Sequence, residues 1–177
     1  MKLSDSRLIN LIKREVIVIE PRPDLSEIEG VTVPLHLGNE FIDICEVNED
    51  FLDPDDNTLS DRFEKVIEDD FYDLKPGSLT LAITKEVITL RDHYMARLDG
   101  RSRLARLGIS VHVTAHRIDP GFSGTIVLEI FNCSKNTIRL KIGSEIGALL
   151  VEEVEGRVEK PYRQKDSTYA GQAGVRL

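Results

Sequence analysis

The sequence of 177 residues is 41% hydrophobic and 31% charged, which fits one compact domain with a substantial core. Its formal net charge of -8 argues against broad nucleic-acid binding, because such binding relies on clustered Lys and Arg side chains that face the phosphates. The sequence has no run of about 18 apolar residues and no signal-peptide core, so we expect a cytoplasmic protein without a membrane partner.

Cysteine content and charge distribution narrow the expected ligands. Cys45 and Cys133 are too few for a disulfide framework and form no Cys-x-x-Cys pair, so we expect reduced thiols and no zinc. Acidic residues are concentrated between positions 46 and 73. The middle of the chain instead carries a group of arginines, which are Arg97, Arg101, Arg103, Arg106 and Arg117. A small anionic ligand needs only such a local basic site.

Taken in chain order, the sequence predicts a short helix at 4–14, where apolar side chains recur at helical spacing behind a Ser or Asp cap. Short apolar runs between Pro, Gly, Asn and Asp residues then predict strands. These strands are expected at 16–19, 31–33, 41–44, 79–83, 86–90, 109–114, 124–132, 137–142 and 146–154. A solvated acidic loop is expected at 48–61, a helical turn at 62–69 and a second short helix at 102–107.

These elements together predict a mostly-β fold over residues 1–177. The architecture expected is a single barrel-like or jelly-roll domain with one or two short helices. Residues 161–177 contain several Gly and Ala residues and no continuous apolar face. We therefore expect them to form a mobile carboxyl-terminal tail.

Two segments between residues 99 and 124 carry polar groups that are candidates for ligand binding. Gly100-Arg101-Ser102 precedes the second predicted helix and offers backbone N–H groups, a hydroxyl and a guanidinium, all of which suit phosphate oxygens. The alternative is a solvated helix cap with surface arginines. In the predicted turn from 118 to 124, Asp119 taken alone is a turn-stabilising side chain.

Glu129 is the acidic residue within an apolar predicted strand. Strand alternation places Val127, Glu129 and Phe131 on one face. If that face points inward, the carboxylate must be paired, protonated or functional, and it could then carry protons in a reaction. The alternative interpretation is an edge strand with Glu129 in water.

The histidines are poor metal ligands in this pattern. His112 and His116 are an even number of positions apart in a predicted strand and could share a face, but no third ligand follows with suitable spacing. We expect them to have a polar-core or supporting role, and the sequence assigns no role to His36 or His93.

The segment from 100 to 129 resembles the signature of the dCTP deaminases. In that family a Gly-Arg-Ser-Ser-Leu-(Ala or Gly)-Arg block precedes a Thr-Ala-His-Arg-Ile-Asp-Pro-Gly block and a Leu-Glu strand. The matching segments here are 100–106, 114–121 and 128–129. The resemblance extends to the opening helix and to 37–39, 75–77 and 162–174, so it spans essentially the whole chain.

The resemblance implies a distorted β-barrel of the dUTPase-like type, assembled as a homotrimer with active sites at subunit interfaces. The implied reaction is hydrolysis of dCTP to dUTP and ammonia without zinc, in pyrimidine deoxynucleotide synthesis. Zinc-dependent nucleobase deaminases carry H-x-E and P-C-x-x-C motifs, which are missing from this sequence. Mg²⁺ would be carried by the substrate triphosphate, and dTTP is a possible feedback inhibitor.

The resemblance also implies roles for individual residues. Glu129 would carry protons from the attacking water to the leaving ammonia. Ser102, Arg106 and the Ala115 carbonyl would position the water and the pyrimidine, and His112 would support them. The nucleotide-binding residues implied are Arg101, Ser102, Arg103, Leu104, Ala105, Arg106, Asp119, Val127, Leu128, Glu129, Tyr162, Thr168 and Gln172. Of these, Asp119 would bind the deoxyribose, and Tyr162 and Gln172 would close over the triphosphate as parts of a flexible lid formed by residues 161–177.

The sequence departs from the family pattern at two positions, and three other functions are alternatives. Arg103 replaces the second serine of the first block, and Thr168 stands where a Lys is common. A bifunctional deaminase and dUTPase would continue from dUTP to dUMP and pyrophosphate, and a plain dUTPase would use Asp119 to activate water. A catalytically silent nucleotide-binding homologue is the third alternative.

Overall fold

The computed structural model describes residues 1–44, 51–56, 58–164 and 174–175, and these form a mostly-β fold, as the sequence predicts. The strands are β1 (Ile17–Glu20), β2 (Thr32–Asp43), β3 (Lys65–Ile67), β4 (Phe71–Leu74), β5 (Leu79–Leu90), β6 (Tyr94–Gly100), β7 (Ile109–Ser110), β8 (Arg117–Ile118), β9 (Ser123–Asn132), β10 (Ile138–Lys141) and β11 (Glu145–Glu153). The helices are α1 (Asp5–Lys13) and α2 (Ser102–Ala105), with the 3-10 turns η1 (Leu25–Glu27), η3 (Leu59–Arg62) and η4 (Tyr162–Gln164).

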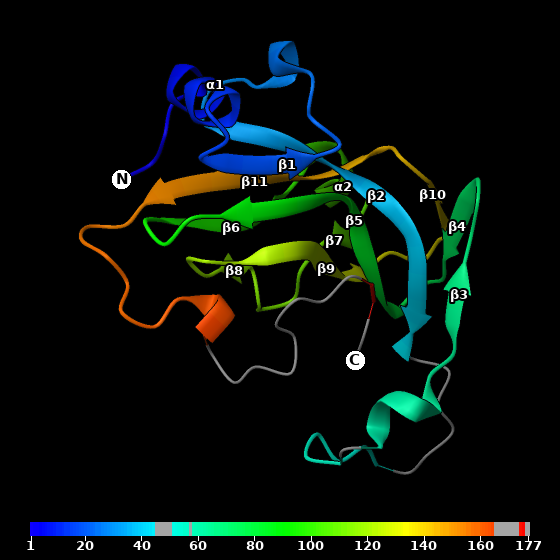
Figure 1. Cartoon of the computed structure of the whole chain (residues 1–177). Helices are drawn as coiled ribbons and strands as arrows, with labels where there is room; N and C mark the ends of the chain where they lie inside the picture. Colours follow the sequence, from blue (N-terminus) through cyan, green and yellow to red (C-terminus); the bar gives the residue numbers. More distant parts are fainter. Residues whose placement is uncertain (45–50, 57, 165–173, 176–177) are drawn as a thin grey trace.

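Nine of the strands form one antiparallel sheet, whose main path is β7-β9-β5-β2-β11-β6-β8. In addition, β1 pairs with β5 and β3 pairs with β2, while β4 and β10 form a separate two-stranded sheet. Figure 1 shows the large sheet strongly curled, with α1 beside β1 at one end and β3, β4 and β10 gathered at the opposite side. Along the described chain, no helix is long and apolar enough to span a membrane.

The two faces of the sheet have different packing. The main core takes up the apolar stripe of α1 and one face of β9, where Ile126, Leu128 and Ile130 are buried. Phe41 stacks on Tyr72 in this region, with ring centroids 4.1 Å apart. A smaller apolar cluster forms elsewhere and consists of Ile42, Leu81, Ile83 and Val175, with Val127 against it. Alternation along β9 therefore directs its side chains into two separate environments.

Two predicted strand pairs prove to be single long strands. The sequence predicts separate strands at 31–33 and 41–44, and at 79–83 and 86–90, but β2 and β5 each run through the gap. Both gaps contain register irregularities, which shift the alternation of apolar residues. Gly38 allows the close approach there, since a Cβ atom would lie 2.8 Å from Ile83 Cγ1.

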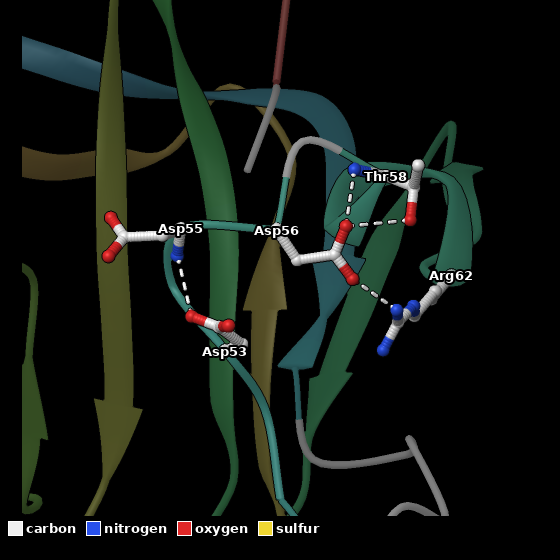
Figure 2. A network of polar contacts seen from close by, with 5 residues as sticks. All are labelled: Asp53, Asp55, Asp56, Thr58 and Arg62. Atoms are coloured by element: carbon white, nitrogen blue, oxygen red, sulfur yellow. Dashed lines mark hydrogen bonds and ion pairs between the residues drawn. The ribbon is translucent and has the colours of Figure 1, made fainter.

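The acidic loop is held by its own turn hydrogen bonds. Asp53 accepts a hydrogen bond from the Asp55 N–H at 3.0 Å, and Asp56 accepts two from the N–H and hydroxyl of Thr58, both at 2.8 Å. Arg62 pairs with the second oxygen of Asp56 (Figure 2). The local role of these carboxylates is thus to form turns. The helical turn predicted at 62–69 is wrong beyond its first residue, because η3 ends at Arg62 and β3 begins at Lys65.

Candidate active site

Glu129 projects from β9 on the side opposite to the main core. Its neighbours Leu128 and Ile130 are buried, whereas Glu129 is half-buried and lies in register with Leu81 of β5. On the other side, β7 pairs with only the last two residues of β9, at Phe131 and Asn132. The chain that follows β7 can therefore turn back across Glu129.

One oxygen of Glu129 is held by this returning loop. Glu129 Oε2 accepts hydrogen bonds from the backbone N–H of Val113 at 2.8 Å and of Thr114 at 3.3 Å. Within the described part of the chain, Oε1 accepts no hydrogen bond from the protein. The carboxylate is thus neither buried in the core nor free in water. One oxygen is fixed and the other is available to a ligand.

The same hydrogen bonds explain why the strand predicted at 109–114 ends early. The Ser110 hydroxyl donates to the carbonyl of His112, and Glu129 binds the next two amides, so the chain forms a loop. His112 and His116 consequently do not share a strand face, although their ring centroids are 5.2 Å apart. His112 Nδ1 is buried and has no hydrogen-bond partner among the described residues.

The short helix α2 presents its arginines toward the start of β11. Leu104 is buried and packs into the main core, so it anchors the helix, whereas Ser102 and Arg106 are exposed. Arg101 Nη2 lies 2.8 Å from Glu145 Oε1, and Arg103 Nη2 donates to the Glu145 carbonyl oxygen at 2.7 Å. The sequence did not single out Glu145, yet this residue binds both arginines.

The turn that contains Asp119 meets the start of the predicted lid. Asp119 forms an ion pair with Arg117, whose Nε lies 2.9 Å from Asp119 Oδ1, and the backbone N–H of Tyr162 donates to the Pro120 carbonyl at 2.7 Å. The Tyr162 ring contacts the Phe122 ring, with centroids 5.5 Å apart. Two candidate nucleotide-binding residues that are far apart in sequence therefore lie at one turn.

Comparison with known proteins identifies the family of this chain. The family model described as dCTP deaminase-like matches residues 2–154, which is most of the chain. The chain belongs to the dCTP deaminase-like family. It is 44% identical to a dCTP deaminase of Alteromonas mediterranea, over 99% of this chain and 94% of that relative. It is 43% identical to a dCTP deaminase of Tolumonas auensis, over 99% of this chain and 96% of that one.

A solved structure supports the fold assignment. The dCTP deaminase-like chain superposes on the 2'-deoxycytidine 5'-triphosphate deaminase of Agrobacterium tumefaciens with a TM-score of 0.66 at 19% identity. The match covers 85% of this chain and 47% of that chain, so this chain corresponds to about half of the longer one. The prediction of a mostly-β fold with short helices is confirmed.

The remaining candidate residues differ in what they can offer a nucleotide. Ala115 is exposed, and Val127 is half-buried on the same face as Glu129. Leu128 is fully buried, so only its backbone can reach a ligand. Thr168 and Gln172 lie outside the described residues. In the ranges that the structure describes, no three His, Cys, Asp or Glu side chains are grouped so that they could hold a metal ion.

A buried acid–histidine pair lies beside Glu145, the residue that binds both arginines. Glu86 is only 4% exposed, and its carboxylate binds both the ring Nδ1 of His36, at 2.7 Å, and the backbone N–H of His36, at 2.9 Å. His36 in turn lies in register with Glu145. The signal in the sequence is that Glu86 falls on the core-facing alternation of β5, between Thr84 and Ile88, where a carboxylate needs a partner.

Proposed function

We propose that this protein hydrolyses dCTP to dUTP and ammonia, with Glu129 as the proton carrier and without zinc. The observation that supports this proposal is the hydrogen bonding of the Glu129 carboxylate. Its Oε2 atom is bound by two backbone amides, and its Oε1 atom is available at a half-exposed position. A base held in this way can accept a proton without a change in its own position.

The proposed reaction uses Glu129 twice. As a water oxygen bonds to C4 of cytosine, Glu129 accepts one water proton and delivers it to N3. The second water proton then passes from the new hydroxyl through Glu129 to the amino nitrogen. The C4–N bond breaks, ammonia leaves and a C4 carbonyl remains. Both water protons are accounted for, and no covalent enzyme intermediate is needed.

The surrounding residues are assigned to parts of the nucleotide. Ser102, Arg106 and the Ala115 carbonyl position the water and the base, with His112 behind them. Arg101 and Arg103 bind phosphate oxygens, which favour guanidinium donors. The groups that complete the site are Asp119 at the deoxyribose, the backbone of Val127 and Leu128 at the pyrimidine edge, the helix residues Leu104 and Ala105, and Tyr162, Thr168 and Gln172 over the triphosphate. Mg²⁺ is carried by the phosphates.

The proposal includes a homotrimer in the cytoplasm, with sites at subunit interfaces and dTTP as a feedback inhibitor. A half-exposed carboxylate beside a loop fits a site that a neighbouring subunit completes. Sedimentation measures the assembly directly, and a monomer that turns over dCTP would overturn the shared site.

The deciding experiment is incubation of the purified protein with dCTP and Mg²⁺, in the presence of a chelator that removes zinc but spares magnesium. Nucleotides are separated by chromatography and ammonia is assayed in the same samples. Equal amounts of dUTP and ammonia are the expected result. Loss of activity on chelation, with recovery on adding zinc, would contradict the zinc-free mechanism. Glu129→Gln serves as the inactive control.

The same assay separates the alternative functions. The bifunctional enzyme gives dUMP and pyrophosphate from dCTP, and the plain dUTPase gives them from dUTP alone. Asp119 is the residue that such chemistry would use, but its Oδ1 atom is bound to Arg117 at 2.9 Å, which favours a binding role. A silent homologue would bind dCTP and release neither product.

A further inference from the structure

The start of the carboxyl-terminal segment is attached to the turn between β5 and β6 by a charged contact. Arg163 donates from both terminal nitrogens to the two carboxylate oxygens of Asp92, and the Nη2–Oδ2 distance is 2.7 Å. Arg157 approaches the same carboxylate at 3.7 Å. The Asp92 side chain is 12% exposed, so water competes little for it. Such a two-point contact restricts the orientation of both side chains.

This contact lies where three chain segments meet. The β5–β6 turn is bound to the turn that contains Asp119 by a hydrogen bond from the Leu90 N–H to the Phe122 carbonyl, at 2.9 Å. Pro161 packs on Gly121 so closely that a Cβ atom on that glycine would lie 2.7 Å from Pro161 Cβ. A hollow of about 450 Å³ remains between these segments, lined in part by Arg91, His93 and Ser123.

We infer that Asp92 and Arg163 are positioning residues for the nucleotide: their contact fixes Tyr162 against the turn that contains Asp119. Tyr162 directly precedes Arg163, and its N–H is bound to Pro120 at 2.7 Å. The inference rests on the proposed function, in which Tyr162 and Asp119 both contact the substrate. Holding them together before binding reduces the conformational entropy lost when the nucleotide arrives.

Electrostatics maintain this contact at neutral pH. The hydrogen bond from Arg163 lowers the pKa of Asp92, and the hydrogen bond to Asp92 raises the pKa of Arg163. Both partners therefore stay charged. The chain also offers a matched control, since Arg139 binds Asp73 through two hydrogen bonds of 2.7 Å each, between β4 and β10 and outside the candidate site.

The test compares Asp92→Asn and Arg163→Gln with the controls Asp73→Asn and Arg139→Gln. Both site variants should raise KM for dCTP about tenfold and leave kcat within about twofold, because a binding contribution is lost and the proton carrier is untouched. The controls should change neither constant. Asp92→Arg combined with Arg163→Asp should restore much of the wild-type KM. In a Tyr162→Ala background, Asp92→Asn should add no further increase.

A direct phosphate contact by Arg163 predicts a different pattern. Asp92→Asn would then free the guanidinium and leave nucleotide binding unchanged or tighter, while Arg163→Gln alone would weaken it. That pattern overturns the positioning role. The role is also overturned if Asp92→Asn raises KM in the Tyr162→Ala background as much as it does in wild type.

Proteolysis checks the contact without any nucleotide. Trypsin should cleave after Arg163 at least about fivefold faster in Asp92→Asn than in wild type or in Asp73→Asn, because the paired side chain is withheld from the protease. Equal rates overturn the inference.

If wild type neither binds nor converts dCTP, the proposed function fails. If it does both and Asp92→Asn matches it, only the positioning role fails.

Discussion

Glu129 combines a catalytic and a structural contact in one side chain, and the two can be separated by substitution. Glu129→Gln keeps an oxygen that can accept the amides of Val113 and Thr114 but removes the ability to take a proton. We expect ammonia release to fall by about 100-fold or more, while the unfolding midpoint changes little. Glu129→Ala, which also loses the loop contacts, should lower both. Substantial activity in Glu129→Gln would contradict the assignment of the proton carrier.

Arg103 replaces the second serine of the family's first block and makes a contact of its own. Its guanidinium donates to the Glu145 carbonyl, beside the Arg101–Glu145 ion pair. If it also binds phosphates, Arg103→Ser should weaken dCTP binding about tenfold and dCMP binding much less, since the effect follows the number of phosphates. Calorimetry on the Glu129→Gln background measures both affinities without turnover. Equal losses for the two nucleotides would assign Arg103 to folding of α2 instead.

At the level of single residues, the sequence predicts which face a side chain occupies better than it predicts the partner. Alternation places Glu129 apart from Leu128 and Ile130, as observed. The amides of Val113 and Thr114 were not predictable, because the apolar run there is typical of a strand. Whether the chain continues as a strand or turns back depends on the carboxylate that it meets. That information lies in the tertiary structure.

Individual elements show where local patterns are insufficient. The short strand β8 pairs over only two residues with β6, and neither of these strands was predicted. Their sequences mix charged and apolar side chains, because one side of each strand carries residues such as Arg97 and Arg117 while the other is buried. Pairing with β11, which is strongly apolar, supplies most of the order in β6. Context of this kind outweighs intrinsic strand propensity.

The irregularity between β2 and β5 provides a test at the scale of an element. A Cβ atom at Gly38 would lie 2.8 Å from Ile83 Cγ1 and 2.9 Å from the Ile83 carbonyl oxygen, and the backbone oxygen cannot rotate away. Gly38→Ala should therefore lower the free energy of unfolding by about 1–3 kcal/mol. Gly100→Ala is the control, since its nearest neighbour would be Val111 Cγ2 at 3.5 Å. Denaturant unfolding measures both variants, and similar losses would show that the close approach is not the cause.

Across the whole molecule, acidic side chains outnumber basic ones, and several carboxylates form ion pairs with nearby arginines. Of 31 acidic residues, several are paired with arginines from distant parts of the chain. Arg139 and Asp73 connect β10 with β4 at one side, while Arg163 and Asp92 connect η4 with the β5–β6 turn at the other. The arginine of each pair is at least half-exposed, so each pair contributes modestly to stability, and the contribution depends on the charge of the carboxylate.

The dependence of stability on pH should reveal these pairs. Hydrogen bonds from Arg139 and Arg163 lower the pKa of Asp73 and Asp92 below the ordinary value of 3.8. The pKa of each carboxyl group is lower in the folded protein than in the unfolded chain. Each pair therefore stabilises the protein fully at pH values above the unfolded pKa, and this contribution is lost as the pH falls through the folded pKa. A variant that combines Asp73→Asn with Asp92→Asn should melt below wild type at about pH 6, and the two melting curves should converge toward about pH 2. A gap of constant size across this range would assign the lost stability to packing rather than to charge.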